Sequence, residues 1–576
     1  MSLIQQRPSL SPSDTQLPLD MHPVMQRVLS SRGVREAADI DHSLKRLMPY
    51  AAMKGLTEAV ELLIPVVMSG RKLVVVGDFD VDGACSTALA VLVLRALGAT
   101  SVSYLVPNRF EHGYGLTPEL VRLCQPMQPD LIMTVDNGIA AVEGVRAAKA
   151  EGIQVLVTDH HLPGAELPGA DAIVNPNQPG CAFTSKAACG CTVVFYLMLA
   201  LRARLSQVGF ERPLPNMAEY LDLVALATVA DVVPLDHNNR ILVEQGLRRI
   251  RSGHVRPGIR ALIDAAGRAS GRLVSSDFGF ALGPRLNAAG RLNDMGLGIE
   301  CLMSQSYESA LSIARQLDEL NRERRDIEHS MSQDAERYLK QFDVAQDYPA
   351  GLALYRADWH PGVVGILASR VKDKTHRPVI ALAQDGNSLK GSARSIKGLH
   401  MRDALDLVDK RNPGLMQKFG GHAMAAGLSL VLPENQAPEQ VLERFRLGFE
   451  QVCEEMLQPE DLQPVIWTDG ELRAEELNFE LAEQLRWAYP WGQAFPEPIF
   501  SGEFQLVQQR LVGGRHLKMV VQPLDSTQIL DAIWFNIDPT LWPQPELNRA
   551  RLVYQLDINE FRGQSSLQLL VRELIV

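Results

Sequence analysis

The stretch KLVVVGDFDVDGACS, residues 72–86, determines how the first half of this chain is predicted to fold. Its apolar, β-branched run at residues 73–76 predicts a buried strand, and Gly77 then releases the backbone into a loop. Beyond Gly83, residues 84–97 carry apolar side chains at helical spacing. The loop therefore joins a strand to a helix, and such loops are where binding sites form in open α/β sheets.

This loop carries three carboxylates at alternate positions, Asp78, Asp80 and Asp82. Because like charges repel, a fold that holds them together at neutral pH needs a cation, protonation or pairing. An EF-hand calcium loop begins with the same D-x-D-x-D-G spacing, but its twelfth position is Leu89 here, and the loop follows a strand. Two other interpretations stay open on this stretch alone: a haloacid-dehalogenase-type phosphatase with one aspartate as nucleophile, and a polar turn with solvated carboxylates.

After the first strand, short apolar runs alternate with amphipathic helical patterns. The predicted strands are residues 101–106, 131–135, 154–157 and 172–174. Strands that alternate with helices indicate βαβ units, which build a mainly parallel sheet covered on both faces. The sequence therefore predicts an α/β fold for this part of the chain.

Acidic and histidine residues directly follow these apolar runs. Asp136 follows one strand in TVDNG, and Asp159, His160 and His161 follow the next in VTDHH. Asp231, in ALATVADVVPL, comes just after a run that is predicted to be a helix. Singly, each residue is explained as a helix cap, a turn residue or a hydrogen-bonded histidine. Because the carboxyl ends of parallel strands share one edge of a sheet, the group is predicted to converge there as a metal site.

The types of ligand limit which metal the predicted site would bind. Carboxylates predominate, with one or two imidazoles and no thiolate, so Mg²⁺ or Mn²⁺ is favoured over zinc, and the histidines favour Mn²⁺. The aspartates carry too much negative charge for one divalent ion, whereas two ions that share a bridging carboxylate would balance it. Such a pair suits displacement at phosphorus, with the adjacent histidine orienting the phosphate or protonating the leaving oxygen.

Length and composition describe a protein of several domains. At 576 residues the chain is too long for one core and is expected to form about three or four domains. No apolar run approaches the roughly 18 residues of a membrane span, and the N-terminus lacks the apolar core of a signal peptide, so we expect a cytoplasmic protein without a membrane partner. Cys181, Cys189 and Cys191 are predicted to be buried thiols rather than zinc ligands. The net charge of −11 argues against a generally basic surface but is compatible with a local basic groove.

The motifs GDFDVDG, TVDNG, TDHH and ATVADVVPL resemble those of the DHH phosphoesterase superfamily. Their order and spacing are similar to its RecJ branch, the bacterial exonucleases specific for single-stranded DNA, over nearly all of the chain beyond residue 50. The resemblance implies a two-metal centre with Asp136 as the bridging ligand and His161 near the scissile phosphate. The implied metal ligands are Asp78, Asp80, Asp82, Asp136, His160 and Asp231, and the implied catalytic residues are His161, Asp136 and Asp159. Wider relatives carry a histidine where this chain has Val76, so the division of ligands between the two ions stays open.

Two further stretches of the first domain are candidates for holding substrate. In the loop NRFEHGYGL, Arg109 and His112 would contact phosphates and Tyr114 would stack on a base, unless the loop is an ordinary glycine-rich turn. The stretch GPRLNAAGRLND is predicted to be a loop that presents Arg285 and Arg291. The resemblance implies that these two arginines hold the DNA strand.

The longest helical pattern, residues 306–343, is predicted to connect the first sheet to a second domain, with a cleft between the two. The second domain alternates strands and helices and resembles the DHH-associated type 1 domain, which binds substrate. In KGSARS, the resemblance places Ser392 and Arg394 in a pocket for a terminal phosphate. In FGGHAMAAG, the residues Gly420, Gly421 and His422 are predicted to precede a small-residue helix whose N-terminus approaches a phosphate.

The last segment changes to five alternating strands separated by glycine and polar turns. This pattern predicts a small barrel of the OB type, a usual clamp for single strands. Its candidate DNA contacts are Arg510, Arg515, Lys518, Tyr554 and Phe561, although aromatic residues in a small barrel are more often core.

The chain is thus predicted to have five parts. These are an N-terminal extension (1–50), a DHH catalytic domain (51–300), a connector helix (301–345), a DHH-associated substrate-binding domain (346–456) and an OB-fold nucleic-acid-binding domain (457–576).

The residues themselves predict phosphoester hydrolysis by two metal ions and, through the clamp-like domains, a polymeric substrate. The resemblance implies a 5′ to 3′ exonuclease of single-stranded DNA in recombination and in repair, including mismatch repair, with single-strand-binding protein and a recombination helicase as partners. We also expect a monomer. Two alternatives stay open: a phosphatase or phosphodiesterase of small nucleotides or pyrophosphate, and a catalytically silent scaffold, which ranks last because every acidic position is filled.

Overall fold

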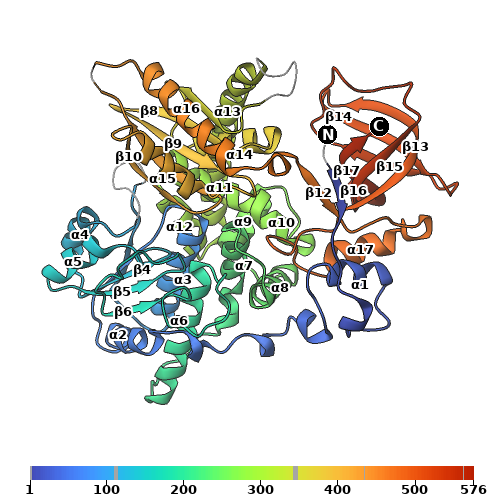
Figure 1. The fold of residues 1–576 in the computed structure, drawn as a ribbon. Coiled ribbons are helices and arrows are strands. Elements are labelled where there is room, and N and C mark those ends of the chain that lie inside the picture. The colour runs from blue at the N-terminus through green and yellow to red at the C-terminus, as the bar shows by residue number, and fades with distance from the viewer. Residues whose placement is uncertain (1–2, 109–114, 341–347, 434, 562) are drawn as a thin grey trace. The chain divides into compact units, whose positions relative to one another are not determined.

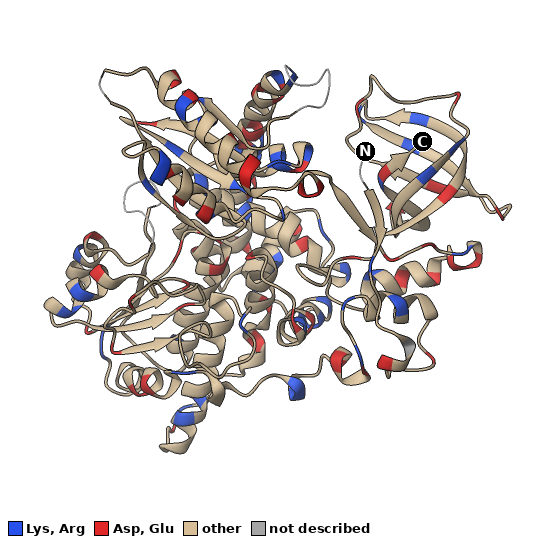
Figure 2. Cartoon of the chain, viewed as in Figure 1, with Lys and Arg blue, Asp and Glu red and all other residues tan. Residues whose placement is uncertain are grey.

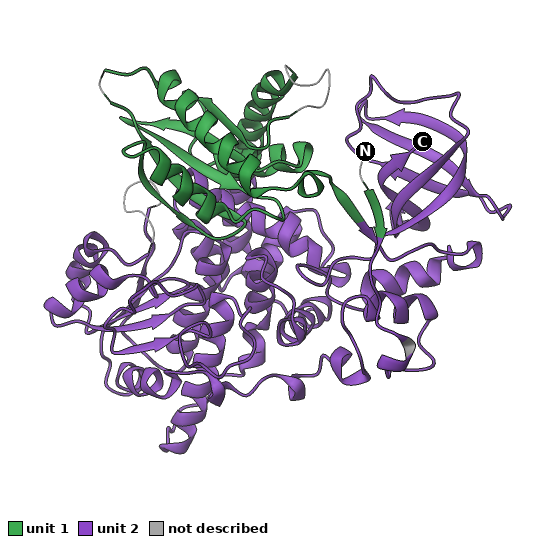
Figure 3. Ribbon diagram, in the orientation of Figure 1, with its two compact units in different colours: residues 1–5, 319–466 green, residues 6–318, 467–576 purple. Residues whose placement is uncertain are grey.

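The computed structural model describes residues 3–108, 115–340, 348–433, 435–561 and 563–576 (Figure 1). The chain separates into two compact units, one of residues 1–5 and 319–466 and the other of residues 6–318 and 467–576 (Figure 3). None of the helices in the described ranges combines the length and the apolar character that a bilayer crossing requires.

The larger unit contains the predicted parallel sheet, with strand order β3-β2-β4-β5-β6 (Figure 1). Its strands are β2 (Leu73–Val76), β3 (Val102–Leu105), β4 (Leu131–Val135), β5 (Gln154–Thr158) and β6 (Ala172–Val174). All four neighbouring pairs are parallel, which confirms the α/β class. The chain runs from β2 outward to β3 and then returns past β2 to β4, so the strand order reverses between β2 and β4. Such a reversal opens a crevice at the carboxyl ends of the strands.

Helices pack around this sheet and continue beyond it. They are α1 (Pro23–Ser30), α2 (Leu56–Met68), α3 (Val81–Ala96), α4 (Pro118–Cys124), α5 (Val142–Ala150), α6 (Gly190–Gln207), α7 (Leu221–Ala230), α8 (His237–Arg251), α9 (Pro257–Ala265), α10 (Ser275–Asp277), α11 (Gly283–Leu292) and α12 (Gly296–Met303). All four residues of β2 are buried, and α3 is buried on nearly every side because it packs against α6, α7 and α12. A helix that is apolar all round is a core helix, and α3 therefore anchors the aspartate loop rigidly.

The stretch GPRLNAAGRLND was predicted to be a loop, and this prediction is wrong: α11 occupies most of it. Pro284 is the second residue of α11 and stands just after the point where the helical winding changes. Gly290 is required for close packing, since a Cβ there would lie 2.0 Å from the carbonyl oxygen of Phe79. A π-helical turn, Phe278–Leu282, precedes α11.

The larger unit also contains the predicted OB-type barrel, a closed sheet with strand order β13-β14-β15-β17-β16. Its strands are β13 (Phe500–Val512), β14 (His516–Pro523), β15 (Leu530–Trp534), β16 (Arg549–Phe561) and β17 (Gln564–Ile575), and α17 (Phe479–Trp487) packs against β16. The parallel pairing of β15 with β17 closes the barrel. Arg32 forms a buried ion pair with Asp469, at 2.6 Å, just before the barrel begins.

The smaller unit is a second α/β domain with strand order β10-β11-β9-β8-β7. Its elements are β7 (Leu352–Arg356), α14 (Val364–Thr375), β8 (Val379–Asp385), β9 (Ser388–Arg394), α15 (Met401–Arg411), β10 (Met416–Gly421), β11 (Ala425–Val431) and α16 (Pro438–Met456). Only β7 and β8 are parallel among the described pairs of this sheet. The long helix α13 (Tyr307–Leu339) leads into this domain, and β1 (Leu3–Gln6) pairs with β12 (Val465–Thr468).

The prediction of a helix after FGGH is also wrong, because the strand β11 follows there and pairs with β10. The segment AAGLSLV alternates buried and more exposed residues, as a strand does, and its small residues were mistaken for a helical pattern. Gly420 and Gly421 end β10, and the backbone N–H of His422 donates to the carbonyl oxygen of Ala425 across the turn.

Candidate metal centre and nucleic-acid sites

The predicted acidic residues meet at the crevice where the strand order reverses. Asp78 and Asp80 lie in the loop after β2, and Asp82 lies in the first turn of α3. Asp80 caps that helix, since its Oδ1 accepts from the N–H of Gly83 at 3.0 Å. Asp136 directly follows β4 with a φ of 62°, and its N–H bonds to the carbonyl oxygen of Thr158 at 3.0 Å. Neighbouring strands thus present these side chains from a rigid edge.

His160 lies among the carboxylates. Its Nε2 is 3.1 Å from Oδ1 of Asp136, 3.6 Å from Oδ2 of Asp231 and 3.8 Å from Oδ2 of Asp82. Among the described residues, three groups of side chains have ligand atoms within 4.8 Å of one another. These groups are Asp78 with Asp80 and Asp136; Asp82 with His160 and Asp231; and Asp136 with His160 and His161. All the residues predicted to be metal ligands are therefore brought together.

The electrostatics of this cluster favour a bound cation. Burial, together with the charges of Asp82 and Asp80, raises the pKa of Asp136 well above its ordinary value. The same causes raise the pKa of Asp231, and burial and Asp80 raise that of Asp82 to about 6. Oδ2 of Asp231 is buried and has no hydrogen-bond partner among the described residues. Without a counter-charge, these buried carboxyl groups are costly to ionise. A cluster of carboxylate oxygens of this kind is the type of site that hard divalent cations occupy.

Asp82 is held by a helix that sequence reasoning did not connect with the site. Its two carboxylate oxygens accept from the backbone N–H groups of Gly190 and Cys191, at 2.6 and 2.8 Å, in the first turn of α6. The N-terminus of a helix favours a negative charge, so α6 stabilises this carboxylate. A Cβ on Gly190 would lie 2.7 Å from Cβ of Asp136, so glycine is needed for this close approach. The only signal in the sequence was the glycine after Cys189.

Asp159 holds the loop of the two histidines and orients His161. Its Oδ1 lies 2.8 Å from Nδ1 of His161 and also accepts the N–H groups of His160 and His161. Its Oδ2 accepts from the N–H of Ile139 at 2.9 Å. Burial opposes ionisation of Asp159, but its interactions with the two histidines and with Ile139 lower its pKa below the ordinary value. Burial alone would lower the pKa of His161, but Asp159 and nearby carboxylates raise it to about 9.

Two asparagines that the sequence analysis did not single out hold the histidine loop. Nδ2 of Asn175 donates to the carbonyl oxygen of His161 at 3.0 Å, and Nδ2 of Asn177 donates to that of His160 at 2.6 Å. Both asparagines follow β6, the strand beside β5. The loop that carries both histidines is thereby fixed from the adjacent strand end.

Three family models match the chain: the N-terminal domain of the DHH family over residues 72–228, the DHHA1 domain over 349–454 and the RecJ OB domain over 468–573. The single-stranded-DNA-specific exonuclease RecJ of Dickeya dadantii is 53% identical over 580 residues, and the match covers 100% of both chains. The chain belongs to the RecJ family.

Other RecJ proteins show the same likeness. The enzyme of that name from Escherichia coli is 52% identical over 561 residues, with 96% of each chain covered. The crystal structure of RecJ in complex with Mn²⁺ from Thermus thermophilus has a TM-score of 0.79 at 29% identity and covers 99% of this chain and 79% of that one. A second structure of that protein, in complex with Mg²⁺, has a TM-score of 0.75 at 27% identity, with 100% of this chain and 78% of that one covered.

The arginines that the RecJ resemblance assigned to DNA lie on a helix. Arg285 is nearly buried, and its guanidinium contacts Oδ1 of Asp318 at 2.8 Å and the carbonyl oxygen of Ala281 at 2.6 Å. Arg285 therefore holds α11 in place through contacts within the protein. Arg291 is half-buried near the end of the same helix. Arg109 and Tyr114, with His112, lie outside the described residues, so their contacts stay predictions.

The residues of the smaller unit that were predicted to bind a terminal phosphate lie together. Nη1 of Arg394 donates to Oγ of Ser392 at 2.9 Å, and both side chains lie against Gly365 at the start of α14. Across the sheet, Ser392 is paired with Gly427, and Gly427 with Gly420. The predicted serine, arginine and Gly420 thus share one region of this sheet, although Gly420 belongs to a hairpin rather than to a helix N-terminus.

Among the described side chains of the barrel, Tyr554 departs from the predicted contacts. Tyr554 is only 1% exposed, so it belongs to the core and is not a surface platform for bases. Arg510 and Arg515 are exposed, and Lys518 pairs with Asp531 at 3.0 Å. Figure 2 shows basic residues interleaved with acidic ones on the barrel strands. The side chain of Phe561 is outside the described residues.

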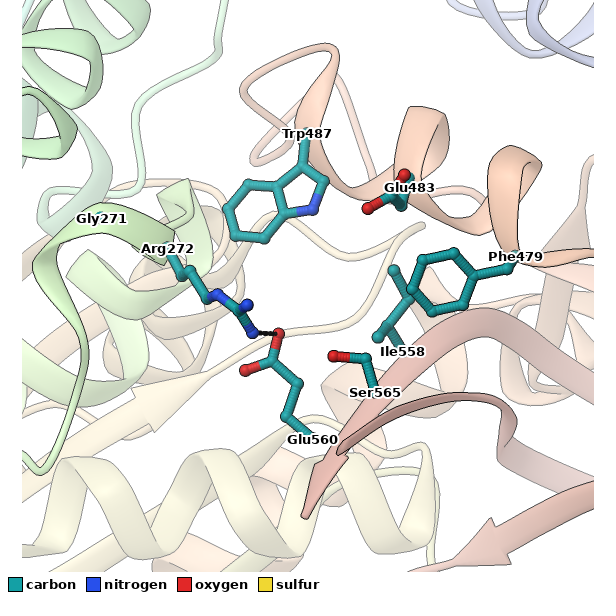
Figure 4. Close-up of a pocket in the computed structure, with 8 residues that line it drawn as sticks. All are labelled: Gly271, Arg272, Phe479, Glu483, Trp487, Ile558, Glu560 and Ser565. Atoms are coloured by element: carbon teal, nitrogen blue, oxygen red, sulfur yellow. Dashed lines mark ion pairs between the residues drawn. The ribbon is translucent and has the colours of Figure 1, made fainter. Parts of the chain in front are cut away.

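A separate pocket of about 220 Å³ lies beside the barrel (Figure 4). Phe479, Glu483 and Trp487 line it from α17, and Arg272 reaches in to form an ion pair with Glu560 of β16. Among the residues whose side chains the structure describes, none that was predicted to bind metal or DNA lines this pocket.

Proposed function

We propose that this chain is a metal-dependent exonuclease that hydrolyses phosphodiester bonds of single-stranded DNA from the 5′ end and releases nucleotides during recombination and repair. The observation that carries the proposal is the convergence of five aspartates and His160 at one edge of the parallel sheet. The named activity of the RecJ relatives supports the substrate, since they are described as single-stranded-DNA-specific exonucleases.

The residues of the cluster fit two divalent ions, Mn²⁺ or Mg²⁺. Asp136 belongs to two of the three ligand groups, which supports its assignment as the bridging carboxylate. Asp78 and Asp80 would complete one site, and Asp82, His160 and Asp231 would complete the other. When bound, such ions activate a water molecule and stabilise charge on the phosphate oxygens. The complexes of Thermus thermophilus RecJ with Mn²⁺ and with Mg²⁺ support the choice of metal.

His161 is proposed to act on the phosphate rather than on the ions. Its Nδ1 is engaged by Asp159, so Nε2 is the nitrogen through which it would donate a hydrogen bond to a phosphate oxygen or to the leaving oxygen. Asp159 holds the ring in this orientation and stabilises its charge. His161 would thus act as a positioned acid, and the buried carboxylate of Asp159 would support it.

The remaining assignments concern the DNA strand. Arg394 and Ser392 would recognise a terminal phosphate by charge-assisted hydrogen bonds. Arg291, Arg510 and Arg515 would contact the backbone, because they are cations with exposed or half-buried side chains. Arg109 and Tyr114 stay candidates for the strand close to the cluster.

We also propose the five-part division of the chain at residues 50, 300, 345 and 456, a monomeric state, and single-strand-binding protein and a recombination helicase as partners. The matched ranges of the DHH, DHHA1 and OB models support the order of the domains.

The test is hydrolysis of long single strands that are blocked at the 5′ end, at the 3′ end or at neither. After metal removal by a chelator, activity should return with Mn²⁺ or Mg²⁺, and only the 5′ block should abolish it. A dinucleotide and pyrophosphate serve as competing substrates. Faster turnover of these small substrates than of the long strand would favour the phosphatase alternative and contradict the proposal.

A further inference from the structure

We infer that Asn239 is a positioning residue of the metal centre, because its buried amide ties together the segment that follows Asp231 and the segment that holds Asp82. This inference rests on the proposed metal-dependent function and identifies how one of the two ion sites keeps its shape. Asn239 is fully buried in the first turn of α8. It contacts neither the predicted ligands nor the predicted DNA sites in any described hydrogen bond.

The amide group of Asn239 makes two hydrogen bonds to carbonyl oxygens of different segments. Nδ2 donates to Pro234 at 2.9 Å and to Ala187 at 2.8 Å. The NH₂ group of a carboxamide has two N–H donors, whereas its oxygen can only accept. Because both partners are carbonyl oxygens, the NH₂ group and not the oxygen of Asn239 must face them. Among the twenty side chains only glutamine carries the same group, and it is one methylene longer.

One carbonyl lies in the segment that follows a predicted ligand, and the other lies in the segment that leads to the N–H groups that hold one. Pro234 lies three residues after Asp231, which ends α7. Ala187 lies just before Gly190 and Cys191, whose N–H groups hold the carboxylate of Asp82. A single NH₂ group therefore links the backbone that presents Asp231 to the backbone that clamps Asp82.

These two carboxylates belong to the same ligand group, together with His160. Loss of the link should therefore weaken the ion held by Asp82, His160 and Asp231 more than the ion held by Asp78 and Asp80, which shares only the proposed bridge Asp136 with it. A general structural defect would not separate the two sites in this way. The affinity for a metal ion depends on such contacts, because the residues that hydrogen-bond to the ligands fix the positions of the ligand atoms.

A second contact joins the same two segments. Oγ of Ser185 donates to Oδ2 of Asp236 at 2.6 Å, and Oδ1 of Asp236 accepts from the N–H of Asn239 at 2.9 Å. This contact should keep the segments together when Asn239 is replaced. The expected result is therefore a displaced ligand set in a folded protein.

The experiment is Mn²⁺ binding to the full chain without DNA, measured by electron paramagnetic resonance of the unbound ion and by calorimetry. Asn239→Asp has the same shape but replaces the NH₂ donor with an acceptor. We expect one of the two Mn²⁺ sites to weaken by about 10- to 100-fold while the other weakens much less, as when an outer partner of a metal ligand is lost. Nuclease activity of the variant should recover at high Mn²⁺.

Asn238→Asp is the matched control, because Asn238 is the adjacent buried residue and its Oδ1 bonds to Tyr196 and Met48 instead. It should change thermal stability without separating the two Mn²⁺ sites. The same weakening in Asn238→Asp, or two unchanged sites in Asn239→Asp, would overturn the inference alone. A wild-type chain that binds no Mn²⁺ would overturn the proposed function and this inference with it.

If Asn239→Asp does not fold, Asn239→Ala provides the decision. This variant removes both donors without adding a charge, so the same Mn²⁺ site should weaken. Wild-type Mn²⁺ binding at both sites of Asn239→Ala would then overturn the inference.

Discussion

Asp159 accepts a hydrogen bond from Nδ1 of His161 at 2.8 Å, while its other oxygen accepts from the backbone of Ile139. The backbone N–H of Ile139 therefore fixes the carboxylate of Asp159 in the position from which it orients the imidazole of His161. This relationship gives the pair a role that differs from that of the acids around His160, and the difference can be measured.

Replacing His161 with alanine should lower kcat for single-stranded DNA and leave Mn²⁺ binding unchanged, because the side chain is proposed to act on the phosphate. Asp159→Asn should lower kcat by about 10²- to 10⁴-fold, because the amide cannot support the charge of the imidazole and accepts fewer of the hydrogen bonds that hold the histidine loop. Steady-state kinetics and Mn²⁺ titration of both variants provide the check. Weaker Mn²⁺ binding in His161→Ala would instead make His161 a metal ligand, as its grouping with Asp136 and His160 allows.

Asp136→Asn should reduce hydrolysis by more than the roughly 10- to 100-fold that is typical for an outer partner of a ligand, because Asp136 is the proposed bridge. The matched control is Asp130→Asn, an exposed aspartate just before the same strand, at the opposite edge of the sheet. Its activity should match wild type. Comparable activity in the two variants would remove Asp136 from the centre.

Gly190→Ala should weaken Mn²⁺ binding and activity by about 10- to 100-fold, because the new Cβ would lie 2.7 Å from Cβ and 2.8 Å from Oδ1 of Asp136. Gly169→Ala is the control, since a Cβ there meets no atom within 4 Å. Mn²⁺ titration and melting curves of both proteins test this. A Gly190→Ala protein with wild-type Mn²⁺ affinity would show that the helix can move away at little cost.

Arg394→Ala should reduce the preference for a 5′-phosphorylated strand over an unphosphorylated one, because the guanidinium and Ser392 are proposed to bind the terminal phosphate. Lys390→Ala, on the same strand, removes a cation that pairs with Asp385 and should leave the preference unchanged. Competition between the two strand types gives the ratio directly. An unaltered ratio in Arg394→Ala would disprove the assignment.

Arg32→Ala should destabilise the larger unit by about 3–5 kcal/mol, because it leaves the carboxylate of Asp469 buried without its charge partner. The exposed pair of Arg46 with Asp41 provides the comparison, and Arg46→Ala should hardly change the melting temperature. Thermal and urea unfolding measure both. Equal melting temperatures for the two variants would show that the buried pair contributes little.

Much of the fold and of the metal centre could be predicted because the information is local. Each strand of the parallel sheet is a short apolar run, and the aspartates and histidines directly follow those runs, so the rule that parallel strands end at one edge was enough to bring them together. The barrel was predictable for the same reason, since its strands alternate in burial.

Other features could not be predicted because they depend on contacts between distant segments. Gly290 marked a loop in the sequence, yet it exists to let α11 approach Phe79. Tyr554 resembled a surface contact until the closed barrel enclosed it.

The sequence by itself determined which residues could bind metal and on which edge of the sheet they would stand. Only the tertiary structure decided what holds them there: α6 against Asp82, Asn177 against the backbone of His160, and Asn239 between two segments. The physical reason is that a ligand's identity is carried by its own residue, whereas its position is set by hydrogen bonds from residues up to about a hundred positions away, which no local pattern encodes.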